Sequence, residues 1–336
     1  MLKIGDITFP SSTLLAPLAG ISDLPFRMIN RANGCGFAFT EMISANALVY
    51  HSRKTDVMLT TAPGDRPLGV QLLGNDPETI KRALGIIEKF HFDIIDFNAA
   101  CPVKKVTRKG EGASLLREPK KVRDLLKVIV DAAPVPVTIK IRCGWNALTV
   151  NAVDVARHAQ DAGISALFIH GRSSVQGYKG KVDYGIIGKV KAALDIPVVG
   201  SGDVLSPQLA KRMLDETGCD GVVFARGALG NPWIFSETAE YLRSGTIPPR
   251  PDLATLVETM IAHLNMCCEL YGERGGAVSF RKFFSWYTRG LPAIRPLRDR
   301  AFRAGSGKEV VDIIRELKSV GDGRSALRGG YGLAEG

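Results

Sequence analysis

Three residue types that can do chemistry stand at the ends of short apolar runs in this sequence. Lys140 lies within one such run, His170 ends another, and Cys101 follows a third. A lysine there can form a Schiff base, or it can place a positive charge beside a ligand that gains negative charge. His170 could donate a hydrogen bond to a ligand, and the Cys101 thiol could give up a proton as a general acid. The alternatives are a buried ion pair for the lysine, a satisfied core histidine, and a cysteine that only packs.

Two glycine-containing turns follow the last two apolar runs of this part of the chain. They are Gly200–Gly202, which reads GSG, and Ala225–Gly227, which reads ARG. Glycine lets backbone N–H groups approach an anion closely, and a following helix N-terminus adds its dipole. We therefore expect a phosphate site formed by Gly200, Gly202, Ala225 and Arg226. Two tight turns without a ligand are the alternative.

The apolar runs alternate with amphipathic helical stretches through about 230 residues. The predicted strands are Leu14–Leu18, Phe37–Thr40, Leu68–Leu72, Ile94–Asn98, Val137–Ile141, Ala166–His170, Pro197–Gly200 and Gly221–Ala225. Such alternation is typical of parallel βα units, and continuous apolar strands indicate burial on both faces. Eight units of this length predict the α/β class, as a closed (β/α)8 TIM barrel. An open doubly wound sheet would carry G-x-G-x-x-G after its first strand, where this chain has Pro17–Gly20.

In a TIM barrel the active site lies at the C-terminal ends of the strands. Polar or conformationally special residues occupy these ends here. They are Pro17, Glu41, Gln71, Asn98, Lys140, Arg142, His170, Arg172, Gly200, Gly202, Ala225, Arg226 and Gly227. We expect these residues to converge on one mouth of the barrel.

The amino-acid composition of the chain changes at residues 244–251. This segment, SGTIPPRP, is rich in proline and glycine and predicts a linker. Beyond it, helical periodicity returns in Leu253–Tyr271, Ser279–Tyr287 and Glu309–Val320. The predicted organisation is therefore a catalytic barrel over residues 1–244, a helical domain over residues 252–320, and a flexible tail over residues 321–336.

Positive charge is concentrated in two segments of this basic chain, whose net charge is +10. Residues 281–303 hold seven basic residues against one acid, and residues 101–123 hold eight against two. Such clusters raise the expectation of a polyanionic partner, although each could also be a solvated face.

Six cysteines are present without a C-x-x-C pair, so no metal site is expected. No run approaches the roughly 18 apolar residues that a membrane span needs, and Met1–Pro10 lacks the order of a signal peptide. We expect a cytoplasmic protein with free thiols and no membrane partner.

With these motifs in order, the sequence resembles the tRNA-dihydrouridine synthase family, particularly its bacterial B-type branch. The resemblance runs from about Leu15 to Pro292. It is carried by APLAGISDLPFR (16–27), TEMISANAL (40–48), VQLLGNDPE (70–78), DFNAACPVKKVTRKGEGASLL (96–116), IKIRCGW (139–145), IHGRSSVQGY (169–178), GSGDV (200–204), ARGALGNPWIF (225–235) and RKFFSWYTRGLP (281–292). The string N-x-x-C-P-x-x-K-V is the most specific of these.

The resemblance implies an enzyme that reduces the C5=C6 bond of specific uridines in tRNA, with FMN as cofactor and NADPH as transient reductant. It implies contacts to the flavin ring from Pro17, Gln71, Lys140 and His170, and to its phosphate from the two glycine turns and Arg226. The residues expected beside the uracil are Asn98, Arg142 and Arg172. Cys101 would protonate C5 while reduced flavin delivers hydride to C6.

The chain departs from the family pattern at three places. Ser173–Ser174 stands where the family often has Thr-Arg, which puts one phosphate or base contact in doubt. Ser201 replaces an asparagine, and Ala225 replaces a glycine and adds one methyl group near the predicted phosphate. Neither change removes Cys101 or Lys140, so activity is expected.

A uracil stacked in folded RNA must be flipped out to reach a barrel mouth, while other contacts hold the rest of the tRNA. The basic segment 281–303 suits that task, and a monomer is expected. Three alternatives remain at this stage. They are an FMN-dependent barrel enzyme acting on a free pyrimidine, a non-catalytic tRNA-binding protein, and a Schiff-base aldolase using Lys140.

Overall fold

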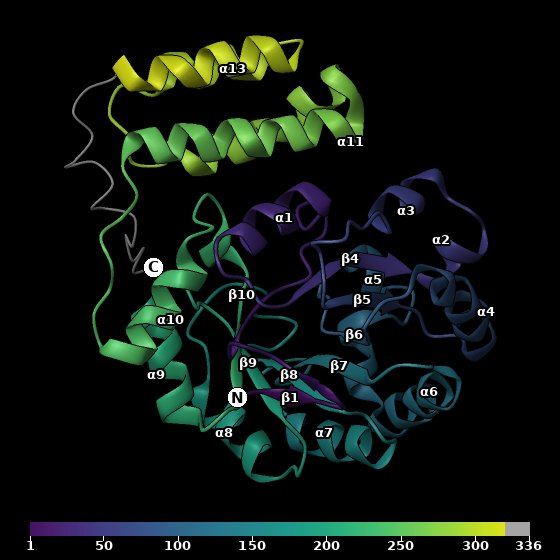
Figure 1. The fold of residues 1–336 in the computed structure, drawn as a ribbon. Coiled ribbons are helices and arrows are strands. Elements are labelled where there is room, and N and C mark those ends of the chain that lie inside the picture. Colours follow the sequence, from purple (N-terminus) through teal and green to yellow (C-terminus); the bar gives the residue numbers. More distant parts are fainter. Residues whose placement is uncertain (320–336) are drawn as a thin grey trace. The chain divides into compact units, whose positions relative to one another are not determined.

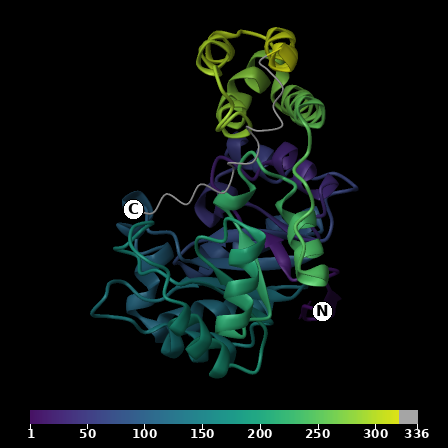
Figure 2. The same cartoon turned by 90° about the vertical axis from the view of Figure 1, so that its left-hand side faces the viewer.

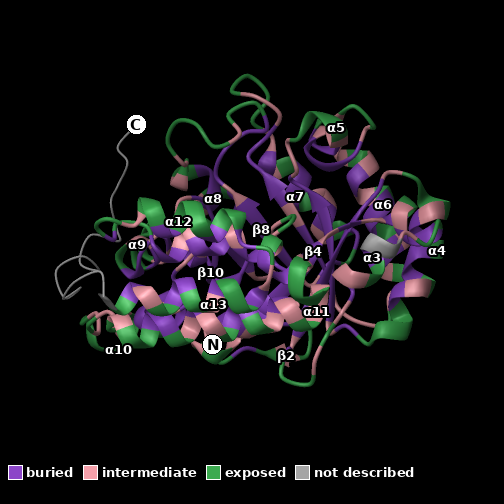
Figure 3. Cartoon of the chain, turned by 90° about the horizontal axis from the view of Figure 1, so that it is seen from above, coloured by how far each residue is buried: buried purple, intermediate pink, exposed green. Residues whose placement is uncertain are grey.

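Eight parallel strands close into a barrel in the order β10-β3-β4-β5-β6-β7-β8-β9, in a computed structural model that describes residues 1–319 (Figure 1). This confirms the predicted TIM barrel followed by helices. The barrel strands are β3 (Thr13–Leu15), β4 (Ala38–Ser44), β5 (Leu68–Leu73), β6 (Ile94–Ala99), β7 (Val137–Arg142), β8 (Ala166–His170), β9 (Val198–Ser201) and β10 (Gly221–Phe224). Seen from above, the strands are buried, as expected for a barrel covered by helices (Figure 3).

Helices connect the strands of the barrel. They are α2 (Ala45–Val49), α3 (Arg53–Met58), α4 (Pro77–Ile87), α5 (Lys104–Thr107), α6 (Pro119–Ala132), α7 (Ala152–Asp161), α8 (Tyr184–Ala192) and α9 (Pro207–Thr217). The start of α4 has a local cause, because the Asp76 side chain accepts the Thr79 N–H and Pro77 occupies the first turn. At α8, Asp183 caps the N–H of Ile186 in the same way.

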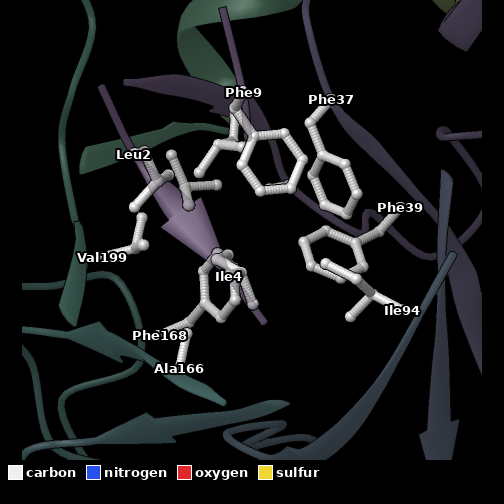
Figure 4. Close-up of a cluster of buried hydrophobic side chains, with 12 residues drawn as sticks. Leu2, Ile4, Phe9, Phe37, Phe39, Ile94, Ala166, Phe168 and Val199 are labelled. Carbon is white, nitrogen blue, oxygen red and sulfur yellow. The ribbon is translucent and has the colours of Figure 1, made fainter. Parts of the chain in front are cut away.

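A short antiparallel hairpin that the sequence analysis did not predict packs into the N-terminal end of the barrel. It consists of β1 (Lys3–Ile4) and β2 (Ile7–Thr8). Leu2, Ile4 and Phe9 from this segment join the buried cluster that fills the barrel (Figure 4). Strands of two residues are too short to show a period-two pattern, which explains the omission.

Aromatic rings fill the interior of the barrel towards the N-terminal ends of the strands. Phe37, Phe39 and Phe168 meet edge to face, with successive ring centroids 4.8 and 5.3 Å apart. Gly69 makes this possible, because a Cβ there would lie 2.5 Å from the Phe39 ring. Side chains alternate between the two faces of a strand, so the next inward residue after Phe168 is His170. The apolar floor thus gives way to polar side chains towards the C-terminal ends of the strands.

The chain divides into two compact units, of which the barrel is the first. Within the described residues, the second comprises residues 25–34, residues 205–207 and residues 226–319. Its helices are α1 (Leu24–Ala32), α10 (Ile234–Ser244), α11 (Leu253–Tyr287), α12 (Arg295–Arg303) and α13 (Gly307–Glu316). Helices α11 and α13 lie side by side in both views (Figures 1 and 2). Within this unit Phe26 stacks on Phe283, with ring centroids 5.5 Å apart.

Helix α11 is interrupted at Gly272, where φ is 76° and ψ is 164°. Helical backbone resumes directly afterwards, although the glycine-rich segment 272–276 left a gap between the predicted helices. Gly276 in this segment has a packing role, because a Cβ there would lie 2.5 Å from the Cys268 backbone. This glycine permits a close approach of the two arms of α11 and does not break the helix.

The predicted boundaries of the barrel and the helical domain, at residues 244 and 252, stay a prediction. The predicted tail over residues 321–336 lies outside the described residues, as does the expected helix end at residue 320. No helix of the described chain has both the length and the apolar character needed to cross a membrane.

Candidate active site at the mouth of the barrel

Four residues predicted to contact a ligand lie on successive strands of the barrel. Gln71 is on β5, Asn98 on β6, Lys140 on β7 and His170 on β8. In the parallel register Asn98 is opposite Lys140, and Gln71 is opposite Asp96. The predicted site residues of these strands therefore form one continuous inner surface.

A buried carboxylate that the sequence analysis missed anchors this surface. Asp96 accepts a hydrogen bond from Gln71 Nε2 at 2.7 Å and another from Thr138 Oγ1 at 2.7 Å. Burial raises the pKa of Asp96 to about 6, against the two hydrogen bonds and the nearby Lys140 charge, which lower it. The available signal was its position two residues before Asn98, on the same face of β6.

Asn98 connects this network to the loop of Cys101. Its Nδ2 donates to Gln71 Oε1 at 2.7 Å, and its Oδ1 accepts the N–H groups of Ala100 at 3.0 Å and Cys101 at 2.9 Å. The amide predicted to face a substrate thus also fixes the start of the loop that carries the thiol.

Cys101 is partly exposed, and its backbone packs closely against Gly112. A Cβ at Gly112 would lie 2.8 Å from the Cys101 carbonyl oxygen, and its φ of 60° favours glycine. Ala113 N–H donates to the same carbonyl at 3.0 Å. Burial raises the pKa of the Cys101 thiol, and the Glu111 carboxylate adds to this, while the Val103 N–H and Arg142 oppose it. The group is therefore a protonated thiol at neutral pH, as a proton donor must be.

Lys140 is half-buried, and its ammonium makes no hydrogen bond within the described chain. Burial lowers its pKa to about 8, while the Asp96 carboxylate raises it and Arg142 lowers it further. A cation in such a position is available to an anionic or polar ligand.

The ring of His170 has one defined hydrogen-bond direction. Its Nδ1 lies 3.2 Å from the backbone nitrogen of Arg172, which donates to it. In the neutral imidazole the proton then sits on Nε2, which makes that nitrogen a donor.

The two arginines predicted to face a substrate are buried and hold loops together. Arg142 donates from Nε to the Ala100 carbonyl at 2.8 Å, and from one terminal nitrogen to the carbonyls of Ser173 and Gly177 at 3.0 and 2.9 Å. Its guanidinium lies 5.7 Å from the ring centroid of the exposed Tyr178. Arg142 therefore ties the Cys101 loop to the loop after β8.

Arg172 is engaged in a similar way on the other side of that loop. Its guanidinium forms an ion pair with Asp203 and donates to the carbonyls of Lys179 and Gly180. Only 3% of the Arg172 side chain is exposed. These contacts of Arg172 therefore stabilise the loop that follows β8.

The predicted phosphate turns lie at the ends of β9 and β10. Gly202 has a φ of 125°, and a Cβ there would lie 2.9 Å from Val182. Gly200 is different, because it lies inside β9 and a Cβ there would meet Met213 Sδ at 2.7 Å. Ala225 is half-buried and Arg226 is exposed. Pro17, on the loop after β3, is half-buried.

Known proteins resemble this chain in sequence over most of its length. The family model for dihydrouridine synthase matches residues 14–319. A tRNA-dihydrouridine synthase B from Pseudomonas aeruginosa is 39% identical over 298 residues, which cover 89% of this chain and 90% of the relative. A probable tRNA-dihydrouridine synthase 1 from Synechocystis is 37% identical over 320 residues, covering 95% and 90% of the two chains.

Two solved structures share the fold at low sequence identity. A 6-hydroxypseudooxynicotine amine oxidase from Pseudomonas geniculata has a TM-score of 0.56 at 15% identity, over 78% of this chain and 52% of that one. A histamine dehydrogenase from Rhizobium has a TM-score of 0.55 at 14% identity, over 95% and 64%. The chain spans less than two thirds of either protein, and the likeness concerns the fold alone.

Proposed function

The chain belongs to the dihydrouridine synthase family, and from this premise we propose that it reduces the C5=C6 bond of uridines in tRNA. The observation that carries the proposal is the loop of Cys101, whose backbone N–H donates to Asn98 Oδ1 on the inner surface formed by Gln71, Asn98, Lys140 and His170. Its relatives are named as tRNA-dihydrouridine synthases, which supports the same substrate.

The residues at the barrel mouth fit FMN as cofactor. A flavin ring offers carbonyl oxygens and ring nitrogens that need hydrogen-bond donors, and charge near its N1 tunes its reactivity. The Lys140 ammonium has no hydrogen bond within the described chain, and His170 Nε2 is directed to be a donor. Lys140, His170, Gln71 and Pro17 would bind the ring, and the turns with Gly200, Gly202, Ala225 and Arg226 would bind its phosphate.

When bound, reduced FMN would supply a hydride to C6 of the uracil, with NADPH as the transient reductant. Cys101 then gives its thiol proton to C5. Burial keeps that proton on sulfur at neutral pH, and the Asn98 and Gly112 contacts hold the loop that carries it. The proton donor thus comes from this chain, and its position is set before the substrate arrives.

The uracil would meet Asn98 and Arg142. One N–H of the Asn98 amide remains after its bond to Gln71, and it can donate to a uracil carbonyl. Arg142 would lie beside the uracil, between the Cys101 loop and the loop after β8, which it joins. Arg172 would act on the substrate by holding the loop at Lys179 and Gly180.

The second compact unit would hold the tRNA. Helix α12 carries exposed arginines at 295, 298 and 303, in the basic segment predicted to bind RNA. Phosphate contacts of this kind position an RNA without reading its bases. We propose a monomer acting in the cytoplasm, since one tRNA is large enough to span one chain.

An absorbance experiment tests the proposal. Purified protein is examined for a flavin spectrum, reduced with NADPH without oxygen, and then mixed with unmodified tRNA. We expect a yellow protein that bleaches with NADPH and regains its colour when tRNA is added. Recovery with a free pyrimidine, and none with tRNA, would replace the proposal with a small-molecule enzyme. A protein that cannot be reconstituted with FMN would contradict it.

A further inference from the structure

A row of hydrogen bonds joins a buried carboxylate to the loop of Cys101. Thr138 Oγ1 and Gln71 Nε2 both donate to Asp96, each at 2.7 Å. Gln71 Oε1 accepts from Asn98 Nδ2 at 2.7 Å, and Asn98 Oδ1 accepts from the Cys101 N–H at 2.9 Å. Asp96 is 1% exposed, Gln71 1% and Asn98 5%, so water does not compete for these bonds.

The acceptor at the buried end of this row favours one direction for every bond in it. A side-chain amide can be turned by 180°, which exchanges its donor and its acceptor with little change in shape. An ionised carboxylate accepts only, so Asp96 forces the NH₂ group of Gln71 towards itself. The Gln71 carbonyl must then face Asn98, and it takes the NH₂ group of that residue. The Asn98 carbonyl is left to face the backbone N–H groups of the Cys101 loop.

The opposite orientation would release the loop. If Gln71 were turned, its NH₂ group would face Asn98, and the Asn98 carbonyl would turn towards it. The Asn98 NH₂ group would then point at the N–H groups of Ala100 and Cys101, placing donor against donor. Strand geometry and burial would be unchanged, so the two states differ in the acceptor at position 96 and in the backbone N–H groups of Ala100 and Cys101 at the other end, which favour the same orientation.

We propose that Asp96 is a positioning residue for the proton donor Cys101, acting by fixing the amide orientations of Gln71 and Asn98. The inference rests on the proposed role of Cys101 and adds a residue that touches neither the thiol nor the substrate. The charge of Asp96 also faces Lys140, the titratable group that neighbours it on β7, while Thr138 and Gln71 face it as neutral groups. A test must therefore separate the acceptor of Asp96 from its charge.

Two substitutions make that separation. In Asp96→Asn the new carbonyl can still accept from Gln71 while its NH₂ group donates to the Thr138 hydroxyl, so the orientation survives and the charge is lost. In Asp96→Leu both are lost at similar volume. The readout is the rate at which iodoacetamide alkylates Cys101 in the purified protein, followed on its peptide by mass spectrometry. Cys268, a partly exposed thiol in the second unit, is the internal reference.

We expect Asp96→Leu to alkylate about fivefold faster, the factor that follows from one lost hydrogen bond of about 1 kcal/mol. Asp96→Asn should alkylate at the wild-type rate. Equal rates in wild type and a folded Asp96→Leu would overturn the proposal. So would an Asp96→Asn variant that matches Asp96→Leu, because the charge and not the acceptor would then be what acts on the loop.

A second variant keeps the test decisive if Asp96→Leu fails to fold by its circular dichroism spectrum. Gln71→Leu leaves Asp96 and its bond from Thr138 in place, but it cuts the row between Asp96 and Asn98. It should raise Cys101 alkylation by the same factor, and an unchanged rate in this folded variant would overturn the proposal. Alkylation requires no tRNA turnover. A normal alkylation pattern in a protein that never reduces tRNA would therefore count against the proposed function and leave the role of Asp96 standing.

Discussion

Lys140 lies directly opposite Asn98 in the parallel register of β6 and β7. One is a half-buried cation without a hydrogen bond in the described chain, and the other is a buried amide committed to Gln71 and Cys101. The barrel thus places an available positive charge next to a side chain that positions the thiol loop. A ligand bound at Lys140 is therefore held beside the group that would protonate the substrate.

The first prediction concerns this ammonium. Lys140→Met should weaken FMN binding about ten- to hundredfold, since a hydrogen bond to a charged group contributes about 1.5–3 kcal/mol. Burial lowers the pKa of Lys140 to about 8, so the positive charge is present below that pH and is lost above it. Wild-type affinity should fall as pH rises through 8, and the variant should lack this fall. Quenching of FMN fluorescence by apoprotein, at pH values on both sides of 8, measures both effects.

Lys120→Met is the control for a lysine on the barrel surface, because Lys120 is exposed on α6. It should leave the affinity and its pH dependence unchanged. If Lys140→Met bound FMN as tightly as wild type at every pH, Lys140 would have no place in the flavin site.

The second prediction concerns the proton donor. Cys101→Ala should lower the rate of uridine reduction by about 10²- to 10³-fold, in the range contributed by a general acid, while the bound flavin is retained. In wild type the rate should stay level through neutral pH, because burial raises the pKa of the Cys101 thiol above its ordinary value. It should fall only at the higher pH where the thiol ionises. Single-turnover reoxidation of reduced enzyme by unmodified tRNA gives this rate.

The matched control is Cys268→Ala, which removes the other partly exposed thiol, on α11. Reoxidation should then proceed at the wild-type rate. Loss of flavin from Cys101→Ala would mean that the thiol supports the cofactor and that its assignment as proton donor is wrong.

The barrel could be predicted from the sequence because its strands are buried on both faces. Each predicted strand overlaps an observed one, and Ala166–His170 coincides with β8 at both ends. The β1–β2 hairpin was missed because two-residue strands carry no period. Helix α12 was missed because Arg295–Arg303 is too basic to show an apolar face, and only Leu297 and Ala301 are buried.

Only those residues of the candidate site that lie at the ends of the predicted strands could be predicted from the sequence. Asn98, Lys140 and His170 could be proposed from the sequence because polar residues interrupt or end apolar runs there. The loop contacts of Arg142 and Arg172 could not be predicted, because the carbonyls that they bind lie on loops whose paths no local pattern determines. Asp96 was missed because it lies two residues before Asn98, whereas the prediction considered only residues at the strand ends.

Gly200 gives a prediction that separates packing from phosphate binding. A Cβ there would lie 2.7 Å from Met213 Sδ and 3.2 Å from Cys219 Sγ, so Gly200→Ala should destabilise the protein by about 1–3 kcal/mol through overpacking. Chemical denaturation of the apoprotein measures this without a ligand. Gly85→Ala is the control, since that helical glycine has open space around its Cβ position and should gain about 0.5–1 kcal/mol. An unchanged stability in Gly200→Ala would show that Met213 moves aside, and any loss of FMN affinity would then belong to the phosphate turn.

The last prediction compares two arginines of α12 that differ in their partners. Arg300 forms two hydrogen bonds with Glu316, at 2.6 and 2.7 Å, while Arg298 is exposed and has no ion pair in the part of the chain that the structure describes. A phosphate contact made by Arg298 needs no competing bond to be broken. Arg298→Ala should therefore weaken tRNA binding and reduce the slope of log K against log salt by about 0.7–0.9. Arg300→Ala should change the slope much less. The measurement is tRNA affinity by filter binding over a salt series. A slope that Arg298→Ala leaves unchanged would place the RNA on another surface. A slope that Arg300→Ala reduces equally would remove the distinction between the free and the paired arginine.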